Sequence, residues 1–208
     1  MPEASWVLFI AASLVLIATP GQDMLLVLSR SVAQGPRAGL ITAAGVSIGL
    51  AGHTLLVTLG LGAVLRTSEI LFTVLKLAGA AYLVYLAVGL LRTRNTGLPV
   101  DARSDISAAR LFLDGALSNL SNPKVAIFYF AFLPQFVEPG GSRPTYSLLA
   151  LGLLYAVLAF AVKAPVGLLA GHLSTWLRTK PWVLIWLYRS SGAVLLALGL
   201  RLALEHRQ

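Results

Sequence analysis

The 208-residue chain contains no cysteine. It therefore has no disulfide, no thiolate to offer a metal and no dithiol redox chemistry. Charge is scarce as well, because Asp, Glu, Lys and Arg make up 12% of the residues, against about 25% in a typical soluble domain. Three widely spaced histidines and eight acidic residues do not supply the cluster of ligands that a metal site needs.

Arrangements typical of membrane-embedded enzymes are not evident either. An intramembrane aspartyl protease needs two buried aspartates, whereas Asp23 is the only aspartate deep within an apolar run. A serine protease needs a serine and a histidine arranged together, and the sequence singles out no such arrangement. We therefore expect a protein that is not an enzyme and that uses no metal or other cofactor.

Apolar residues dominate what is present. Hydrophobic residues make up 57% of the chain and the mean hydropathy is +0.82, beyond the roughly 45–50% apolar content of soluble domains. Six apolar runs are each long enough to cross about 30 Å of hydrocarbon as a helix. They cover residues 5–29, 38–65, 70–91, 111–133, 146–170 and 182–204. Because these runs are continuous and do not alternate, the sequence predicts an all-α integral membrane protein with six transmembrane helices.

The net charge of +8 comes from basic residues in the connections between the runs and from a few cations within the runs. No basic patch is interleaved with stacking aromatic residues, so we expect no nucleic-acid partner. Eight arginines and lysines lie in the first, third and fifth connections, and four lie on the other side, which predicts that both termini are outside the cytoplasm. The eight are Arg30, Arg37, Arg92, Arg94, Arg103, Arg110, Arg178 and Lys180, and the four are Arg66, Arg143, Arg201 and Arg207.

An internal repeat divides the chain into halves. A cation, a glycine, an alanine and a leucine recur at a constant offset of 113 residues, in residues 76–83 and 189–196. The polar segment 92–110 links residues 1–91 to residues 111–208, and each half holds three predicted helices. An odd number of helices inverts the second half, so we expect one transmembrane domain over residues 1–208, built from two inverted three-helix repeats.

Each half also contains a proline within an apolar run: Pro20 in Thr19-Pro20-Gly21 and Pro123 in Asn122-Pro123-Lys124. Proline removes a helical hydrogen bond, and the freed backbone groups must face protein or water. One such proline is commonly a simple kink. Two at matching positions, each near an ionisable residue, predict that helices 1 and 4 are broken at a transport site.

Apart from Asp114 and Arg201 near run ends, five charged residues lie within the runs and mark the same site. Each costs about 2.5–3.5 kcal/mol at a helix centre, and they are Asp23, Lys76, Lys124, Lys163 and Arg189. The cations favour a substrate carboxylate and Asp23 favours an ammonium group, although Lys76 and Arg189 lie near helix ends and can instead reach the interface. We predict a substrate-binding set of Thr19, Pro20, Gly21, Asp23, Asn122, Pro123, Lys124, Lys163 and Arg189. The candidates for proton coupling are Asp23, Lys76 and Lys124.

Four stretches of the chain match a known family. They are Thr19-Pro20-Gly21, Met24-Leu-Leu-Val-Leu-Ser-Arg30, Leu75-Lys76-Leu-Ala-Gly79-Ala-Ala-Tyr82-Leu-Val-Tyr85-Leu86, and Asn122-Pro123-Lys124 with Phe128-Tyr-Phe-Ala-Phe132-Leu-Pro134-Gln135-Phe136. Together they resemble the lysine/homoserine exporter family (LysE/RhtB). The resemblance implies a multi-pass, homodimeric protein of the bacterial inner membrane that exports amino acids or close derivatives and is driven by the proton gradient. Members often carry a second proline where this chain has Gln22, so the resemblance does not fix the substrate.

From these features we expect a secondary active exporter that works by alternating access at a site near the bilayer midplane, with membrane lipid and protons as its other partners. The alternative is a passive channel or a structural scaffold, in which the proline breaks line a pore or only pack.

Overall fold

The computed structural model describes residues 3–19, 21–67, 69–93, 106–137 and 144–204. Every regular element within these ranges is a helix. The elements are α1 (Glu3–Ala18), α2 (Gln22–Gln34), α3 (Pro36–Thr67), α4 (Glu69–Arg92), α5 (Ala108–Leu120), α6 (Pro123–Phe132), η1 (Leu133–Phe136), α7 (Pro144–Leu168), α8 (Ala170–Thr179) and α9 (Pro181–Leu204). The prediction of an all-helical chain is confirmed for this part of the protein.

The helix boundaries follow the apolar runs. α3, α4 and α9 each coincide with one predicted span to within two residues. Proline opens α3, α6, α7 and α9, a position where its missing N–H costs no helical hydrogen bond. The first and fourth runs are each divided between two helices, α1 with α2 and α5 with α6. The first and fourth predicted spans are therefore interrupted next to Pro20 and Pro123, as the sequence predicts.

Helix length and composition support fewer crossings than the six predicted. Among the described residues, three helical segments are long and apolar enough to cross a membrane: Pro36–Gly60, Pro144–Leu168 and Ile185–Leu204. The pair Trp6–Ala18 and Gln22–Gln34, bent by 52°, makes a fourth if it counts as one span. The apolar part of α4 is shorter, and α5 and α6 have only 13 and 10 residues.

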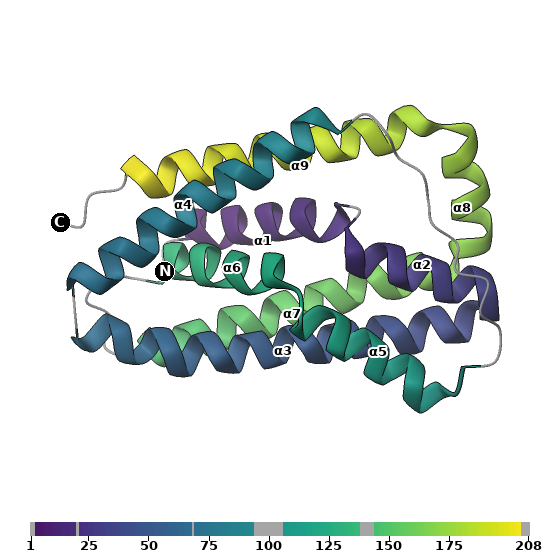
Figure 1. Cartoon of the computed structure of the whole chain (residues 1–208), viewed down its shortest axis with the longest axis horizontal. Helices are drawn as coiled ribbons and strands as arrows, with labels where there is room; N and C mark the ends of the chain where they lie inside the picture. Colours follow the sequence, from purple (N-terminus) through teal and green to yellow (C-terminus); the bar gives the residue numbers. More distant parts are fainter. Residues whose placement is uncertain (1–2, 20, 68, 94–105, 138–143, 205–208) are drawn as a thin grey trace.

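The helices form two outer layers with α1 and α6 between them (Figure 1). α4 and α9 pack together in one layer, while α3 packs against both α5 and α7 in the other. Glycine makes the second layer tight, because a β-carbon at Gly45 would overlap the carbonyl oxygen of Phe112 and one at Gly115 would overlap that of Thr42. Small residues of this kind let membrane helices approach closely, so α5 is fixed on α3.

Aromatic side chains fill the centre of the molecule. The rings of Phe128 and Phe132 in α6 stack with centroids 4.7 Å apart, and Phe9 of α1 lies 5.6 Å from Phe132. Tyr155 of α7 is 5.7 Å from Phe128. This cluster joins α1, α6 and α7 and supplies one wall of the cavity described next.

Candidate functional site

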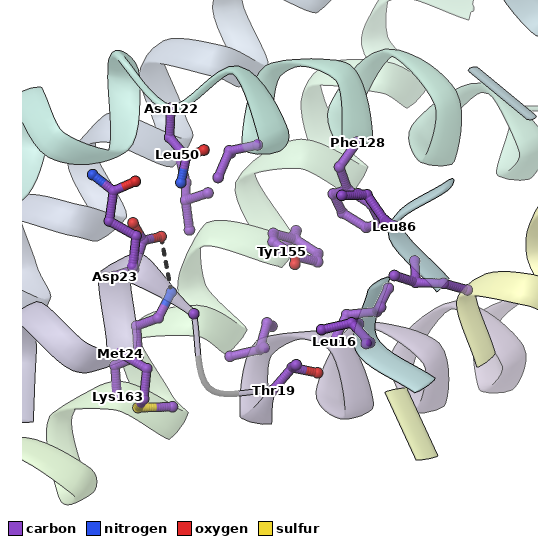
Figure 2. Close-up of a pocket in the computed structure, with 16 residues that line it drawn as sticks. Leu16, Thr19, Asp23, Met24, Leu50, Leu86, Asn122, Phe128, Tyr155 and Lys163 are labelled. Carbon is purple, nitrogen blue, oxygen red and sulfur yellow. Dashed lines mark ion pairs between the residues drawn. The ribbon is translucent and has the colours of Figure 1, made fainter. Parts of the chain in front are cut away.

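A cavity of about 170 Å³ lies where the breaks of both halves meet. Its side chains with polar groups are Thr19, Gln22, Asp23, Asn122, Tyr155 and Lys163. Asp23, Lys163 and Asn122 lie on one side, and Phe128 and Leu86 lie across from them (Figure 2). The volume is below the roughly 300–1,000 Å³ of pockets for drug-sized ligands. The cavity therefore suits a small molecule with both a polar and an apolar part.

Two helices begin at this cavity. The first backbone hydrogen bond of α2 runs from the Leu25 amide to the Gly21 carbonyl at 2.9 Å, and that of α6 runs from the Val125 amide to the Asn122 carbonyl at 3.0 Å. Gly21, Asn122 and Val125 all line the cavity. Amide groups ahead of the first helical bond have no helical acceptor, and helix amino-termini carry partial positive charge. Both breaks thus present anion-binding ends to one space.

An ion pair is buried at the polar side of the cavity. Lys163 Nζ of α7 lies 3.5 Å from Asp23 Oδ2 of α2, with 7% and 11% of the two side chains exposed (Figure 2). The Asn119 side-chain amide of α5 donates to the same Oδ2 at 2.6 Å. Asp23 Oδ1 is buried and accepts no hydrogen bond from the described residues. A buried carboxylate oxygen without a donor is costly, so it provides an acceptor for a ligand.

Asn119 also connects this pair to α3. Its backbone carbonyl lies 3.1 Å from His53 Nε2, and both residues are buried, with exposures of 0% and 2%. Asn119 was not among the predicted site residues. The available signal was an amide side chain in an apolar run, one turn before the break at Asn122.

The predicted site residues have several locations. Thr19, Gly21, Asp23, Asn122 and Lys163 line the cavity together, and the Thr19 hydroxyl donates to the Val15 carbonyl at 2.9 Å and also contacts the hydroxyl of Ser191 in α9. Arg189 is exposed on α9 and is not among the lining residues. Outside the described part are Pro20 as a whole and the side chains of Lys76, Pro123 and Lys124.

One motif with enzymatic spacing has a structural explanation. Gly45-Val46-Ser47-Ile48-Gly49 matches the Gly-x-Ser-x-Gly spacing of serine hydrolases, whose serine sits on a turn between a strand and a helix. Ser47 instead lies within α3, where its hydroxyl donates to the Ala43 carbonyl at 3.1 Å. The two glycines serve the contact with α5.

Comparisons with known proteins cover nearly the whole chain. The sequence profile of the LysE type translocators matches residues 14–206. A homoserine/homoserine lactone efflux protein of Salmonella typhimurium is 31% identical over 199 residues, which are 95% of each chain. Uncharacterized membrane proteins of Pseudomonas aeruginosa and Vibrio cholerae are 32% and 31% identical, over 90% and 95% of this chain and 89% and 96% of the relatives. No solved structure matches. The expected location, a multi-pass protein of the bacterial inner membrane, agrees with these matches and with the apolar helices.

Proposed function

The chain belongs to the LysE type translocator family, and on this premise we propose that it is a secondary active exporter of amino acids or close derivatives. The family is one of transporters and not of enzymes. An efflux relative for homoserine and homoserine lactone aligns over 95% of the chain, so homoserine is the first substrate to test.

The observation that carries the proposal is the buried pair of Asp23 and Lys163 in a small cavity where two helices begin. A free amino acid is a zwitterion. Its ammonium group suits the unpaired Oδ1 of Asp23, and its carboxylate suits Lys163 and the amino-termini of α2 and α6. The apolar wall at Leu86 and Phe128 would contact the side chain of the substrate.

The same geometry supports a proposal of proton coupling. An ammonium group and a proton both neutralise the carboxylate of Asp23, so each excludes the other, which is what a proton antiporter requires. Lys76 and Lys124 remain candidates for the coupling group in this proposal. The test for coupling is whether a pH gradient across the membrane drives transport.

The proposal includes six spans in two inverted repeats and alternating access between them. The breaks at residues 20 and 123 each lie in the first predicted span of a half. The helices that the repeat equates, α3 with α7 and α4 with α9, pack against each other, as expected of units related by a two-fold axis. A homodimer of such units is proposed from the resemblance alone.

Uptake of homoserine by proteoliposomes, with and without a pH gradient, tests the proposal. We expect transport that a gradient accelerates and that Asp23→Asn abolishes. Arg92→Gln removes a charge from the exposed end of α4 and serves as the matched control. Flux that is indifferent to the gradient would favour the channel, and absence of flux for every amino acid would favour the scaffold.

A further inference from the structure

A row of polar contacts runs between α2 and α5, from the cavity to the far end of α2. Gln22 and Asp23 at the start of α2 contact the end of α5, whereas Arg30 contacts its middle and Gln34 contacts the chain just before it, so the two helices are antiparallel. In order along α2, Gln22 pairs with Ser118 at 3.2 Å, Asp23 with Asn119 at 2.6 Å, Arg30 with Asp114 at 3.5 Å, and Gln34 with the Ile106 carbonyl at 3.1 Å. We refer to these four contacts as the α2–α5 seam.

Arg30 is the buried cation of the seam. The sequence assigned it to a connection, but it lies within α2 with only 10% of its side chain exposed. It follows Asp23 by seven residues, which is about two helical turns, so both side chains lie on nearly the same face of α2 about 10 Å apart. Arg30 therefore lies about two helical turns beyond the cavity, toward the carboxyl end of α2. The distribution of arginine and lysine predicts that this end faces the cytoplasm.

The guanidinium of Arg30 is incompletely paired. Its Nη2 lies 3.5 Å from Asp114 Oδ2, while Nε and Nη1 are buried and reach no acceptor among the described residues. A guanidinium has five N–H donors that match a carboxylate in geometry. Two of the three nitrogens are thus available to an anion that approaches along the seam.

Asp114 does not depend on Arg30 for its charge balance. Arg110, one turn earlier in α5, holds Asp114 Oδ1 at 2.8 Å, and 72% of the Arg110 side chain is exposed. If Arg30 turns to another carboxylate, Asp114 keeps its shorter and better paired contact. The geometry therefore permits exchange at Arg30 without leaving the half-buried carboxylate of Asp114 unpaired.

We propose that Arg30 is a carboxylate-binding site on the cytoplasmic access path, where it holds the carboxylate of an exported amino acid before the substrate reaches Asp23. The inference rests on the proposed function and adds a second subsite to it. Its occupants are free amino acids. An ester or lactone has no carboxylate to offer, and so passes without using Arg30. Access requires α2 to separate from α5, and α5 stays in place because Gly45 and Gly115 fix it on α3.

Homoserine and homoserine lactone test this site, because closing the lactone ring consumes the carboxylate, together with the side-chain hydroxyl, and leaves the ammonium group in place. Uptake of each probe by inside-out membrane vesicles, whose cytoplasmic face is outward, gives the half-saturation concentration on the proposed side. For Arg30→Gln we expect this concentration to rise about tenfold for homoserine, the effect of losing one hydrogen bond between charged groups. The value for homoserine lactone stays unchanged, which also shows that the variant is folded.

Two further variants complete the design. Arg92→Gln removes an exposed arginine from α4, away from the seam, and should leave the ratio between the two probes unchanged. Arg30→Lys keeps the charge without the planar fork and should give an intermediate ratio, which also provides a reading if Arg30→Gln does not accumulate in the membrane. Equal loss for both probes, or no change for either, would overturn the role of Arg30. Failure of the unaltered protein to transport both probes would instead overturn the proposed function.

Discussion

The carboxylate of Asp23 and the ammonium of Lys163 lie 3.5 Å apart in the interior of the helix assembly, although the two residues come from opposite halves of the chain. Asp23 Oδ2 is occupied by both Lys163 and Asn119, while Oδ1 has no donor among the described residues. The pair therefore holds α2 against α7 and still offers an acceptor to the cavity.

A double-mutant cycle measures how much the Asp23–Lys163 pair contributes to the free energy of unfolding. Removing one partner leaves an uncompensated buried charge, so Asp23→Asn and Lys163→Met should each destabilise the protein by about 3–5 kcal/mol. The double variant should lose much less than the sum, because replacing both charges is often nearly neutral. Thermal unfolding in detergent provides the measurement. Losses that simply add would show that the two charges do not interact.

Asn119 should matter for transport through its amide group. Asn119→Ala removes the donor to Asp23 but keeps the backbone carbonyl that faces His53. We expect a stability loss of about 1–3 kcal/mol and a slower uptake of homoserine. Leu117→Ala, at a position with 57% exposure on the same helix, is the control and should leave uptake unchanged. Normal uptake by Asn119→Ala would show that the Asn119 amide has no role in transport.

Glycine contacts between α3 and α5 should be sensitive to a single methyl group. Gly45→Ala places a β-carbon against the backbone of Phe112, and overpacking of this kind costs about 1–3 kcal/mol. Gly89→Ala in α4 meets nothing within 4 Å, so alanine there should be neutral or stabilising by up to about 1 kcal/mol. Unfolding temperatures in detergent compare the two variants. A similar shift for both would contradict the close packing.

The absence of cysteine allows the cavity to be probed with single introduced thiols. Leu86 of α4 lines the cavity, whereas Leu83 is fully buried on the same helix and is not among the lining residues. Leu86→Cys should react with a water-soluble maleimide, and homoserine should slow the reaction. Leu83→Cys should remain unlabelled until the protein is denatured. If Leu83→Cys were labelled as fast as Leu86→Cys, the cavity would not have the lining described above.

Several features followed from local chemistry and could be predicted. Continuous apolar runs without alternation specify helices in a membrane, since only a helix satisfies its backbone hydrogen bonds within a single segment. Proline at residues 20 and 123 interrupts helices for a covalent reason, and the breaks occur beside those prolines. Asp23 and Lys163 drew attention because charge in an apolar run is costly, and the structure places both at the cavity.

Other features depend on which helices come together. Arg30 appeared to lie in a connection, because a cation near the end of an apolar run normally marks the interface; it is buried only because α2 continues to Gln34 and packs against α5. Asn119 carries no charge, so its role emerges only when α5 brings its amide to Asp23. Arg189 stays a predicted site residue, and the packing of α9, which the sequence pattern does not give, leaves its side chain exposed.

The sequence by itself determined that this chain is a helical membrane protein with two proline breaks and a few costly internal charges, because composition, proline chemistry and desolvation act locally. Only the tertiary structure decided that the breaks border one cavity, that Asp23 meets Lys163, and that Arg30 is buried with free donors on the α2–α5 seam. Contacts between segments more than eighty residues apart depend on how the helices cross, and a one-dimensional pattern of polarity does not encode that geometry.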